Sequence, residues 1–183
     1  MRLAALVLAT TLIACTDTAP GNAQAQAPAA GTASAASGLP FKVTEVADLN
    51  SPWAMAFLPD GRMLVTEKAG DMLLLSADGK QRRTVATIPV DSAGQGGLMD
   101  VVLAPGFATN RQVYFSYSTA GEGGKGVVLA RGVFDPQAGG ERLRQIEVLF
   151  RATPFVPGDG HYSGRIAFSP DGRYLFFTNG DRQ

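Results

Sequence analysis

The chain has 183 residues, with 16 Lys or Arg and 16 Asp or Glu, and this zero net charge without a basic tract argues against a nucleic-acid-binding protein. Hydrophobic residues make up 45% of the chain and charged residues 17%, which is enough to bury a core and excludes general disorder. One Cys and one His exclude a disulfide framework, a Cys-based zinc site and a His-rich metal site, and they leave a single imidazole for acid–base chemistry.

The N-terminus has the pattern of an export signal. Arg2 gives a positive start, and the apolar run from Leu3 to Ala14 is shorter than the roughly 20 residues that span a bilayer. The run ends at Cys15, and Leu12-Ile13-Ala14-Cys15 resembles the lipobox of bacterial lipoproteins, in which the Cys thiol becomes lipidated. We therefore expect residues 1–14 to be a lipoprotein signal peptide and Cys15 to anchor the protein to a membrane.

The export signal also predicts where the protein resides. An ordinary signal peptide that contains a Cys is the alternative, and both interpretations place the protein outside the cytoplasm. Thr16 rather than Asp follows the Cys, which by resemblance to sorted lipoproteins favours the periplasmic side of the outer membrane. Residues 15–38 are rich in Ala, Thr, Gly, Ser, Gln and Pro, so we expect a flexible linker there and a folded part over 39–183.

Three segments of the folded part resemble one another. Each has an apolar strand, a turn that contains Pro and a second apolar strand; they are Phe57–Thr66, Leu103–Tyr117 and Phe168–Thr178. In the first and the last the turn reads Pro-Asp-Gly, where Pro sets φ, Asp bonds nearby backbone and Gly supplies positive φ.

Two further hairpins are expected between these segments. One joins Met72–Ser76 to Thr84–Ile88 through an Asp-Gly turn, and the other joins Val127–Phe134 to Leu143–Phe150 through the Gly-rich turn Pro136–Gly140. No convincing amphipathic helix follows residue 40.

Strand repeats of about 40–65 residues predict an all-β fold, specifically a β-propeller with about four strands in each blade. A β-sandwich is the alternative, and it does not account for the recurrent strand–turn–strand unit. Residues 39–183 suffice for about three blades, whereas a closed propeller needs at least about four. We therefore expect the chain to be the N-terminal portion of a longer propeller protein.

Four motifs carry a family resemblance. They are Ser51-Pro52-Trp53-Ala54-Met55-Ala56-Phe57, Gly94-Gln95-Gly96-Gly97-Leu98-Met99-Asp100-Val101, His161-Tyr162-Ser163-Gly164-Arg165-Ile166-Ala167-Phe168 and Thr178-Asn179-Gly180-Asp181. In this order they resemble the soluble PQQ-dependent sugar dehydrogenases, the glucose/sorbosone and aldose sugar dehydrogenase group, from about residue 43 onward. The resemblance implies a six-bladed propeller with PQQ over the central axis and the oxidation of an aldose at its anomeric carbon to a lactone.

His161 and Asp181 are the candidate catalytic residues. A lone His in a loop is structural by default, but Gly160 and Gly164 on either side permit the close approach of a ligand. The resemblance implies that His161 is the base that takes the proton of the anomeric hydroxyl while hydride passes to PQQ. A catalytic His needs a partner that sets its tautomer, and Asp181, just past the strand Leu175–Thr178, is the candidate, although a plain turn Asp is the alternative.

Gln95 and Arg165 are the candidate cofactor-binding residues. An amide in a Gly-rich turn can donate to and accept from a planar polar ligand, and the resemblance implies that Gln95 contacts the quinone. Arg165 is able to pair with an acid group of PQQ, and a structural salt bridge is the alternative. Asp100 replaces the small residue of the glucose-specific members, so the sugar is left open.

The rest of the implied site is expected beyond position 183. The family holds PQQ with Arg, Lys and a Ca²⁺ ion, and no Ca²⁺ loop of the Asp-x-Asp type occurs in this sequence. We therefore expect these 183 residues to be inactive alone. The resemblance leaves the electron acceptor open, and a non-catalytic propeller binding module is the rival function, because a fold does not determine an activity.

Overall fold

The apolar runs of the chain fold into antiparallel sheets joined by tight turns. The computed structural model describes residues 40–136 and 141–182. The chain divides into two units, residues 1–43 and 44–183, and all strands of the described part belong to the second. Its one described helix, α1 (Phe107–Asn110), has four residues, and no helix in the described ranges is long and apolar enough to cross a membrane.

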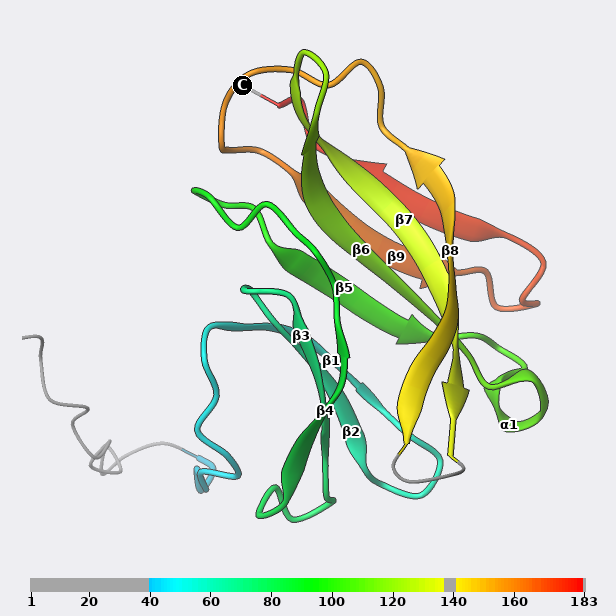
Figure 1. Ribbon diagram of the computed structural model, residues 1–183. Helices are drawn as coiled ribbons and strands as arrows, with labels where there is room; N and C mark the ends of the chain where they lie inside the picture. Colours follow the sequence, from blue (N-terminus) through cyan, green and yellow to red (C-terminus); the bar gives the residue numbers. More distant parts are fainter. Residues whose placement is uncertain (1–39, 137–140, 183) are drawn as a thin grey trace, which may run out of the picture. The chain divides into compact units, whose positions relative to one another are not determined.

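The first two sheets each have four consecutive strands that pair in chain order. The first consists of β1 (Pro52–Phe57), β2 (Met63–Glu67), β3 (Asp71–Leu75) and β4 (Arg82–Thr87). The second consists of β5 (Leu98–Leu103), β6 (Gln112–Gly121), β7 (Gly124–Asp135) and β8 (Arg142–Arg151). Figure 1 shows the two sheets in cyan to green and in green to yellow. A sheet of four sequential antiparallel strands is the unit from which a propeller blade is built.

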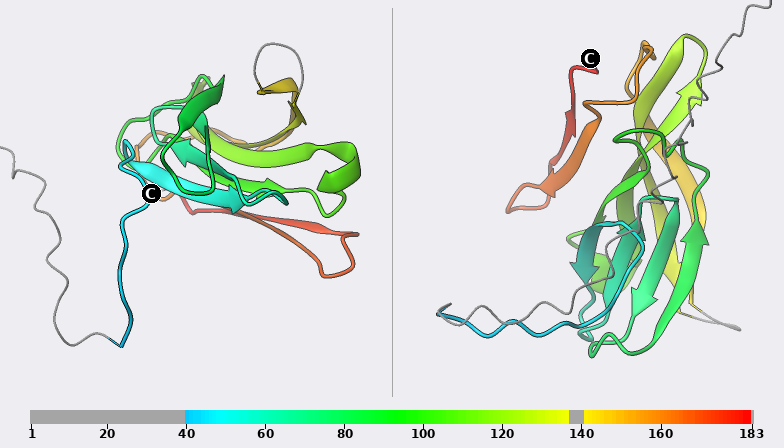
Figure 2. Two further views of the ribbon diagram at one scale, coloured as in Figure 1. Left: turned by 90° about the horizontal axis from the view of Figure 1, so that it is seen from below. Right: turned by 90° about the vertical axis from the view of Figure 1, so that its left-hand side faces the viewer.

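A third sheet contains one antiparallel hairpin in the described residues, made of β9 (Ser163–Phe168) and β10 (Leu175–Asn179). It lies against the second sheet, where β9 contacts β5, β6 and β7 (Figures 1 and 2). The first strands of the three sheets are neighbours, because β5 contacts both β1 and β9. The described part thus contains two complete four-stranded sheets and the first hairpin of a third, close to the expected three blades.

The tight turns form where the Asp-Gly pairs predict them. Asp60, Asp78 and Asp171 each accept a hydrogen bond at 3.1 Å from the backbone N–H two residues later, and the Gly that follows each Asp has φ between +70° and +84°. These contacts stabilise the turns with groups inside the turn itself. The β5–β6 connection differs, since α1 stands in place of a Pro-Asp-Gly turn.

The apolar side chains fill the spaces on both faces of the first sheet and between the second and third. Leu64 and Met72 point into the main core between the first two sheets, while their neighbours Val65 and Leu73 point to the opposite face and pack with Leu49. Strands β2 and β3 are therefore buried on both faces, which explains the continuous apolar runs Met63–Val65 and Met72–Leu75 within them. A smaller core joins the β9–β10 hairpin to the second sheet and includes Tyr162.

The five predicted hairpins are all present at the positions expected, and the separate sheets of sequential strands exclude a two-sheet sandwich for the described residues. The turn of the β7–β8 hairpin includes residues 137–140, which lie outside the described residues, as do the predicted signal peptide, the lipidation site Cys15 and the linker to residue 38.

Candidate active site

Three of the predicted site residues come from three separate segments and meet at one end of the β9–β10 hairpin. Gln95 lies in the connection between β4 and β5, His161 lies in the connection between β8 and β9, and Asp181 follows β10. The pairing of Asn179 with Ser163 brings the end of β10 back to the start of β9. The hairpin therefore places Asp181 beside His161, as its sequence position predicts.

His161 and Asp181 form a direct pair. His161 Nδ1 lies 2.7 Å from Asp181 Oδ1, and the two side chains are 54% and 59% exposed. Because an ionised carboxylate only accepts hydrogen bonds, the proton of a neutral imidazole must lie on Nδ1. This leaves the lone pair on Nε2, and the exposure of the ring makes that atom accessible to a ligand. The arrangement is that of a general base whose tautomer is set by a carboxylate.

Gln95 holds the backbone of His161. The side-chain Oε1 of Gln95 accepts a hydrogen bond of 2.8 Å from the backbone N–H of His161. The backbone N–H of Gln95 donates to the carbonyl of Asp159 at 2.7 Å. The amide oxygen is thus used within the protein. The Nε2 end, with two donors, forms no hydrogen bond within the described residues and remains for a ligand.

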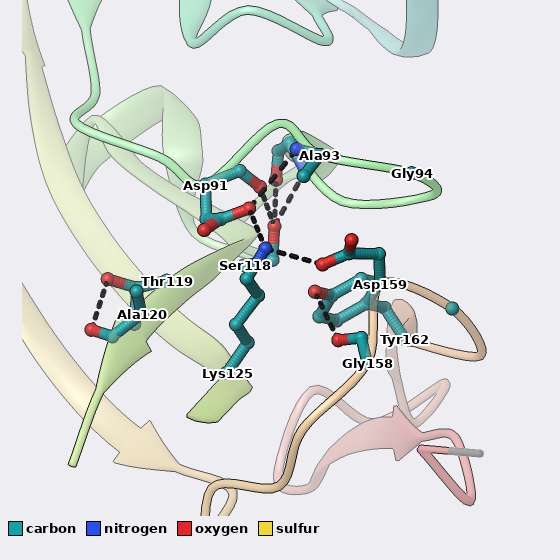
Figure 3. A network of polar contacts seen from close by, with 12 residues as sticks. Asp91, Ala93, Gly94, Ser118, Thr119, Ala120, Lys125, Gly158, Asp159 and Tyr162 are labelled. Atoms are coloured by element: carbon teal, nitrogen blue, oxygen red, sulfur yellow. Dashed lines mark hydrogen bonds and ion pairs between the residues drawn. The ribbon is translucent and has the colours of Figure 1, made fainter. Parts of the chain in front are cut away.

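A charged network supports the two loops that carry Gln95 and His161. Lys125 on β7 forms ion pairs with Asp91, at 3.0 Å, and with Asp159 (Figure 3). The hydrogen bond to Asp159, followed by the one to Asp91, raises the pKa of the Lys125 ammonium. The same ammonium lowers the pKa of Asp91 below 3.8. One cation therefore joins the loop before Gln95 to the loop before His161.

The Gly residues of the Gln95 loop permit close packing. Gly94 has φ +53°, and a Cβ there would lie 2.4 Å from the carbonyl oxygen of Asp159. Lys68, the residue that follows β2, donates from Nζ to the carbonyl of Gly94 at 2.6 Å. The Gly-rich sequence is therefore needed for contact between the two loops, and it brings a cation beside Gln95.

Arg165 lies on β9, and its contacts are separate from those of Gln95, His161 and Asp181. Its Nη1 is 3.1 Å from Oδ1 of the buried Asp100, and its guanidinium stacks 4.4 Å over the ring of Trp53. Asp100 also accepts the N–H of Ile166 at 2.8 Å, so it joins β5 to β9. No hydrogen bond or ion pair of the described residues connects Arg165 to His161, Gln95 or Asp181. Its contact with a cofactor stays a prediction.

Two residues at the site were not identified from the sequence. Lys125 is one of several scattered Lys residues, and no motif marks it. Arg182 follows Asp181 and is buried, with Nη1 donating to the carbonyl of Gly160 and Nη2 donating to that of Gly158 at 3.1 Å. The one clue in the sequence to Arg182 is its position next to Asp181. The two residues contact the same segment, since Asp181 binds the ring of His161 and Arg182 binds the carbonyls that precede it.

Comparison with known proteins identifies the family. The family model described as Glucose / Sorbosone dehydrogenase matches residues 49–183, and the chain belongs to this family. Among solved structures, the soluble aldose sugar dehydrogenase of Escherichia coli in its apo form superimposes with a TM-score of 0.65 and 37% identity, over 73% of this chain and 39% of that one. The PQQ-bound aldose sugar dehydrogenase of Streptomyces coelicolor gives a TM-score of 0.63 and 30% identity, over 76% and 41% of the two chains.

Curated relatives give the same result. Aldose sugar dehydrogenase YliI of Escherichia coli (strain K12) is 37% identical over 136 residues, which are 73% of this chain and 36% of the relative. Quinoprotein glucose dehydrogenase B of Acinetobacter calcoaceticus is 27% identical over 147 residues, which are 75% of this chain and 30% of the relative. The chain thus spans about a third of the length of these relatives. Within residues 40–136 and 141–182, no group of three or more His, Cys, Asp or Glu is placed to hold a metal ion.

Proposed function

We propose that this protein is a quinoprotein aldose dehydrogenase, which oxidises a sugar at its anomeric carbon to the lactone with PQQ as the hydride acceptor. The observation that carries the proposal is the pair of His161 and Asp181, in which Nδ1 and Oδ1 are 2.7 Å apart on a half-exposed imidazole. Membership of the sugar dehydrogenase family supports the substrate class. The PQQ-bound relative and the relative named as a quinoprotein support the cofactor.

His161 acts as the general base in this proposal. Its Nε2 takes the proton of the anomeric hydroxyl, and the electrons of that O–H bond form the carbonyl of the lactone as the hydrogen on the anomeric carbon leaves as hydride. Bound PQQ supplies the two-electron acceptor for this hydride. Asp181 keeps the proton on Nδ1 and stabilises the imidazolium that results, in the manner of a catalytic triad carboxylate. The proton then returns from His161 to solvent.

The residues around His161 fit an anionic quinone. The two N–H donors of Gln95 Nε2 suit oxygen acceptors, which PQQ carries as quinone and carboxylate groups. The ammonium of Lys68 lies 2.6 Å from the carbonyl of Gly94 in the same loop and contributes positive charge there. Gln95 is thus in a position to orient a ligand against the imidazole whose backbone it holds. We also propose Ca²⁺ as a partner of the cofactor, and the family resemblance is the support for it.

Substitution of the base tests the activity. In the full-length protein, His161→Ala should lower kcat by about 10²–10⁴-fold, the usual contribution of a general base. The affinity for PQQ, measured by calorimetry in the presence of Ca²⁺, should change by less than about threefold, because Nε2 serves the sugar. Lys80→Ala, at an exposed turn of the first sheet, is the matched control and should leave kcat unchanged. An unchanged kcat in His161→Ala with several aldoses would refute the proposal.

We also propose that the protein is a lipoprotein facing the periplasm, attached through Cys15 to the outer membrane. The support is the sequence pattern of residues 1–16, since Cys15 lies outside the described residues. Cys15→Ser should move the protein from the membrane fraction to the soluble fraction. If the Cys15→Ser protein stays with the membranes after fractionation, the anchor is not the lipid.

A further inference from the structure

The peptide group between Gly160 and His161 is held on both sides by side chains distant in sequence. Its carbonyl accepts a hydrogen bond from Arg182 Nη1, and its N–H donates to Gln95 Oε1 at 2.8 Å. Both polar groups of one peptide plane are thus bonded to side chains that do not belong to the loop. Because this peptide plane directly precedes the Cα of His161, its orientation helps to set the direction of the Cα–Cβ bond and thus the position of the imidazole.

The backbone at His161 needs such support. His161 has φ +52°, in the left-handed region that residues with a Cβ rarely adopt, and Gly158 in the same loop has φ +104°. A residue stays in this region where its surroundings determine the conformation more strongly than its own preference does. The forked guanidinium of Arg182 provides two of these constraints, since Nη2 also donates to the carbonyl of Gly158 at 3.1 Å.

Arg182 is buried in a way that suits a structural support. It is 8% exposed, its guanidinium stacks 3.6 Å over the ring of Tyr162, and Nη2 also lies 3.4 Å from the carbonyl oxygen of Lys125. Among the described residues it forms no ion pair, and its buried Nε has no hydrogen-bond partner. Burial of a charge without a carboxylate is unfavourable. The carbonyl oxygens of Gly160 and Gly158 therefore stabilise this buried charge, and the charge in turn fixes the loop that carries them.

The chain order of the contacts completes the argument. Gly180 donates its N–H to the carbonyl of Tyr162 at 3.0 Å, Asp181 binds the imidazole of His161, and Arg182 binds the backbone on the other side. Three consecutive residues therefore position a single side chain. Asp181 acts on the ring, whereas Arg182 acts through the backbone, since its hydrogen bonds among the described residues go to backbone carbonyls.

We propose that Arg182 is a positioning residue for His161, which together with Gln95 fixes the Gly160–His161 peptide plane and thereby keeps Nδ1 on Asp181. The proposal rests on the proposed function in so far as His161 is the base. A Lys at this position is able to reach one carbonyl but cannot form the fork, so it should restore the support only in part.

The single His of the chain gives a direct test that needs no cofactor. The chain is labelled with [¹⁵N]histidine, purified with an affinity tag free of His, and its imidazole ¹⁵N spectrum is recorded above the pH at which the ring is protonated. The unchanged chain should show the Nδ1–H tautomer. Arg182→Met should show a mixture of both tautomers, and Arg182→Lys should lie between the two. Arg173→Met, on the exposed turn of the same hairpin, is the matched control and should keep the original spectrum.

Kinetics of the full-length protein give the second measurement. Arg182→Met should lower kcat by about 10–100-fold with KM changed by less than about threefold, since the base and not the sugar contacts is displaced. An unchanged tautomer in Arg182→Met overturns the proposal. If Arg182→Met does not fold, the same criterion applies to Arg182→Lys. A changed tautomer together with full activity of His161→Ala supports the positioning role and refutes His161 as the base, so the two failures are distinguishable.

Discussion

The Asp-Gly turns and the His161 loop hold their unusual backbone conformations by opposite means. In the turns at Asp60, Asp78 and Asp171, the carboxylate bonds a backbone N–H only two residues away, and a Gly takes the positive φ. In the loop, a His takes the positive φ, and its supports are Gln95 and Arg182, which are 66 residues before it and 21 after it.

The difference separates structural turns from the candidate site. A turn stabilised by its own side chains forms wherever its sequence occurs, and the same contacts recur in different sheets of this protein. The His161 loop exists only when three segments have already come together. A conformation that depends on so many distant contacts is retained where its geometry serves a function, which agrees with its place at the His161–Asp181 pair.

The largest effect is expected from removing the acceptor of the imidazole proton. Asp181→Asn places an amide N–H donor beside Nδ1, which favours the tautomer with the proton on Nε2, the wrong atom for a base. We expect kcat to fall by about 10³–10⁴-fold, as in a triad with the same change. Steady-state kinetics of the full-length protein measure it. Asp181→Glu, which keeps a carboxylate, should retain more activity, and equal losses in the two variants would contradict the tautomer argument.

A Cβ at Gly180 tests the crossing of the two segments. It would lie 1.8 Å from the carbonyl oxygen of His161, so Gly180→Ala must displace one backbone from the other. We expect a loss of about 1–3 kcal/mol in the free energy of unfolding, together with at least a tenfold lower kcat. Gly158→Ala is the matched control, because a Cβ there meets nothing within 4 Å, although its φ of +104° adds backbone strain.

Comparison of these two variants separates strain from displacement. Both should lower the Tm, measured by calorimetry, but only Gly180→Ala should lower kcat strongly. A larger loss of kcat in Gly158→Ala than in Gly180→Ala would show that the flexibility of the loop, and not the crossing at Gly180, controls the position of His161.

The ion pair of Lys125 with Asp91 predicts how the stability of the site loops depends on pH. Its hydrogen bond keeps the pKa of Asp91 below 3.8, so the pair stabilises the fold above that pH and its contribution is lost as the pH falls through the lowered pKa. In Lys125→Met this contribution is absent. The Tm of the unchanged protein should therefore exceed that of the variant most clearly at pH 6–7, and the difference should shrink below about pH 4. A difference in Tm that grows toward low pH would contradict the role of the pair.

The same contrast explains what the sequence predicts and what it does not. The hairpins follow from alternation of apolar residues and from Asp-Gly pairs, which act over a few residues, so their positions could be derived. His161, Asp181 and Gln95 were found because family motifs mark them. Lys125 and Arg182 belong to no such motif, and their contacts span 34 and 57 residues or involve backbone carbonyls, which carry no sequence signal.

Arg165 is a residue that a sequence motif marks but whose role the sequence does not decide. Its motif is as clear as that of His161, and the sequence left open a contact with the cofactor or a structural salt bridge. Its ion pair with Asp100 and its stacking on Trp53 depend on β1, β5 and β9 being neighbours. Only the arrangement of the three sheets reveals that the same motif joins the sheets through its Arg and presents a candidate base through its His.

The smallest effect is expected at a turn far from the site. Asp78 accepts hydrogen bonds from Ser76 Oγ at 2.6 Å and from the N–H of Lys80 at 3.1 Å, and the bond from Ser76 contributes most to holding the pKa of Asp78 below 3.8. Asp78→Ala removes both bonds, but Gly79 keeps its φ of +71° and the backbone bond from Gly79 N–H to the carbonyl of Ser76 remains.

We expect the Tm of Asp78→Ala at pH 7 to fall by less than about 3 °C, with kcat unchanged, because solvent replaces the lost contacts at an exposed turn. The fall in Tm should shrink as the pH drops below 3.8 and through the lowered pKa of Asp78, and thermal unfolding between pH 7 and acidic pH measures it. A loss of activity in Asp78→Ala without a matching loss of stability would show that the turns of the first sheet are coupled to the His161 loop, and the contrast between the two regions would then fail.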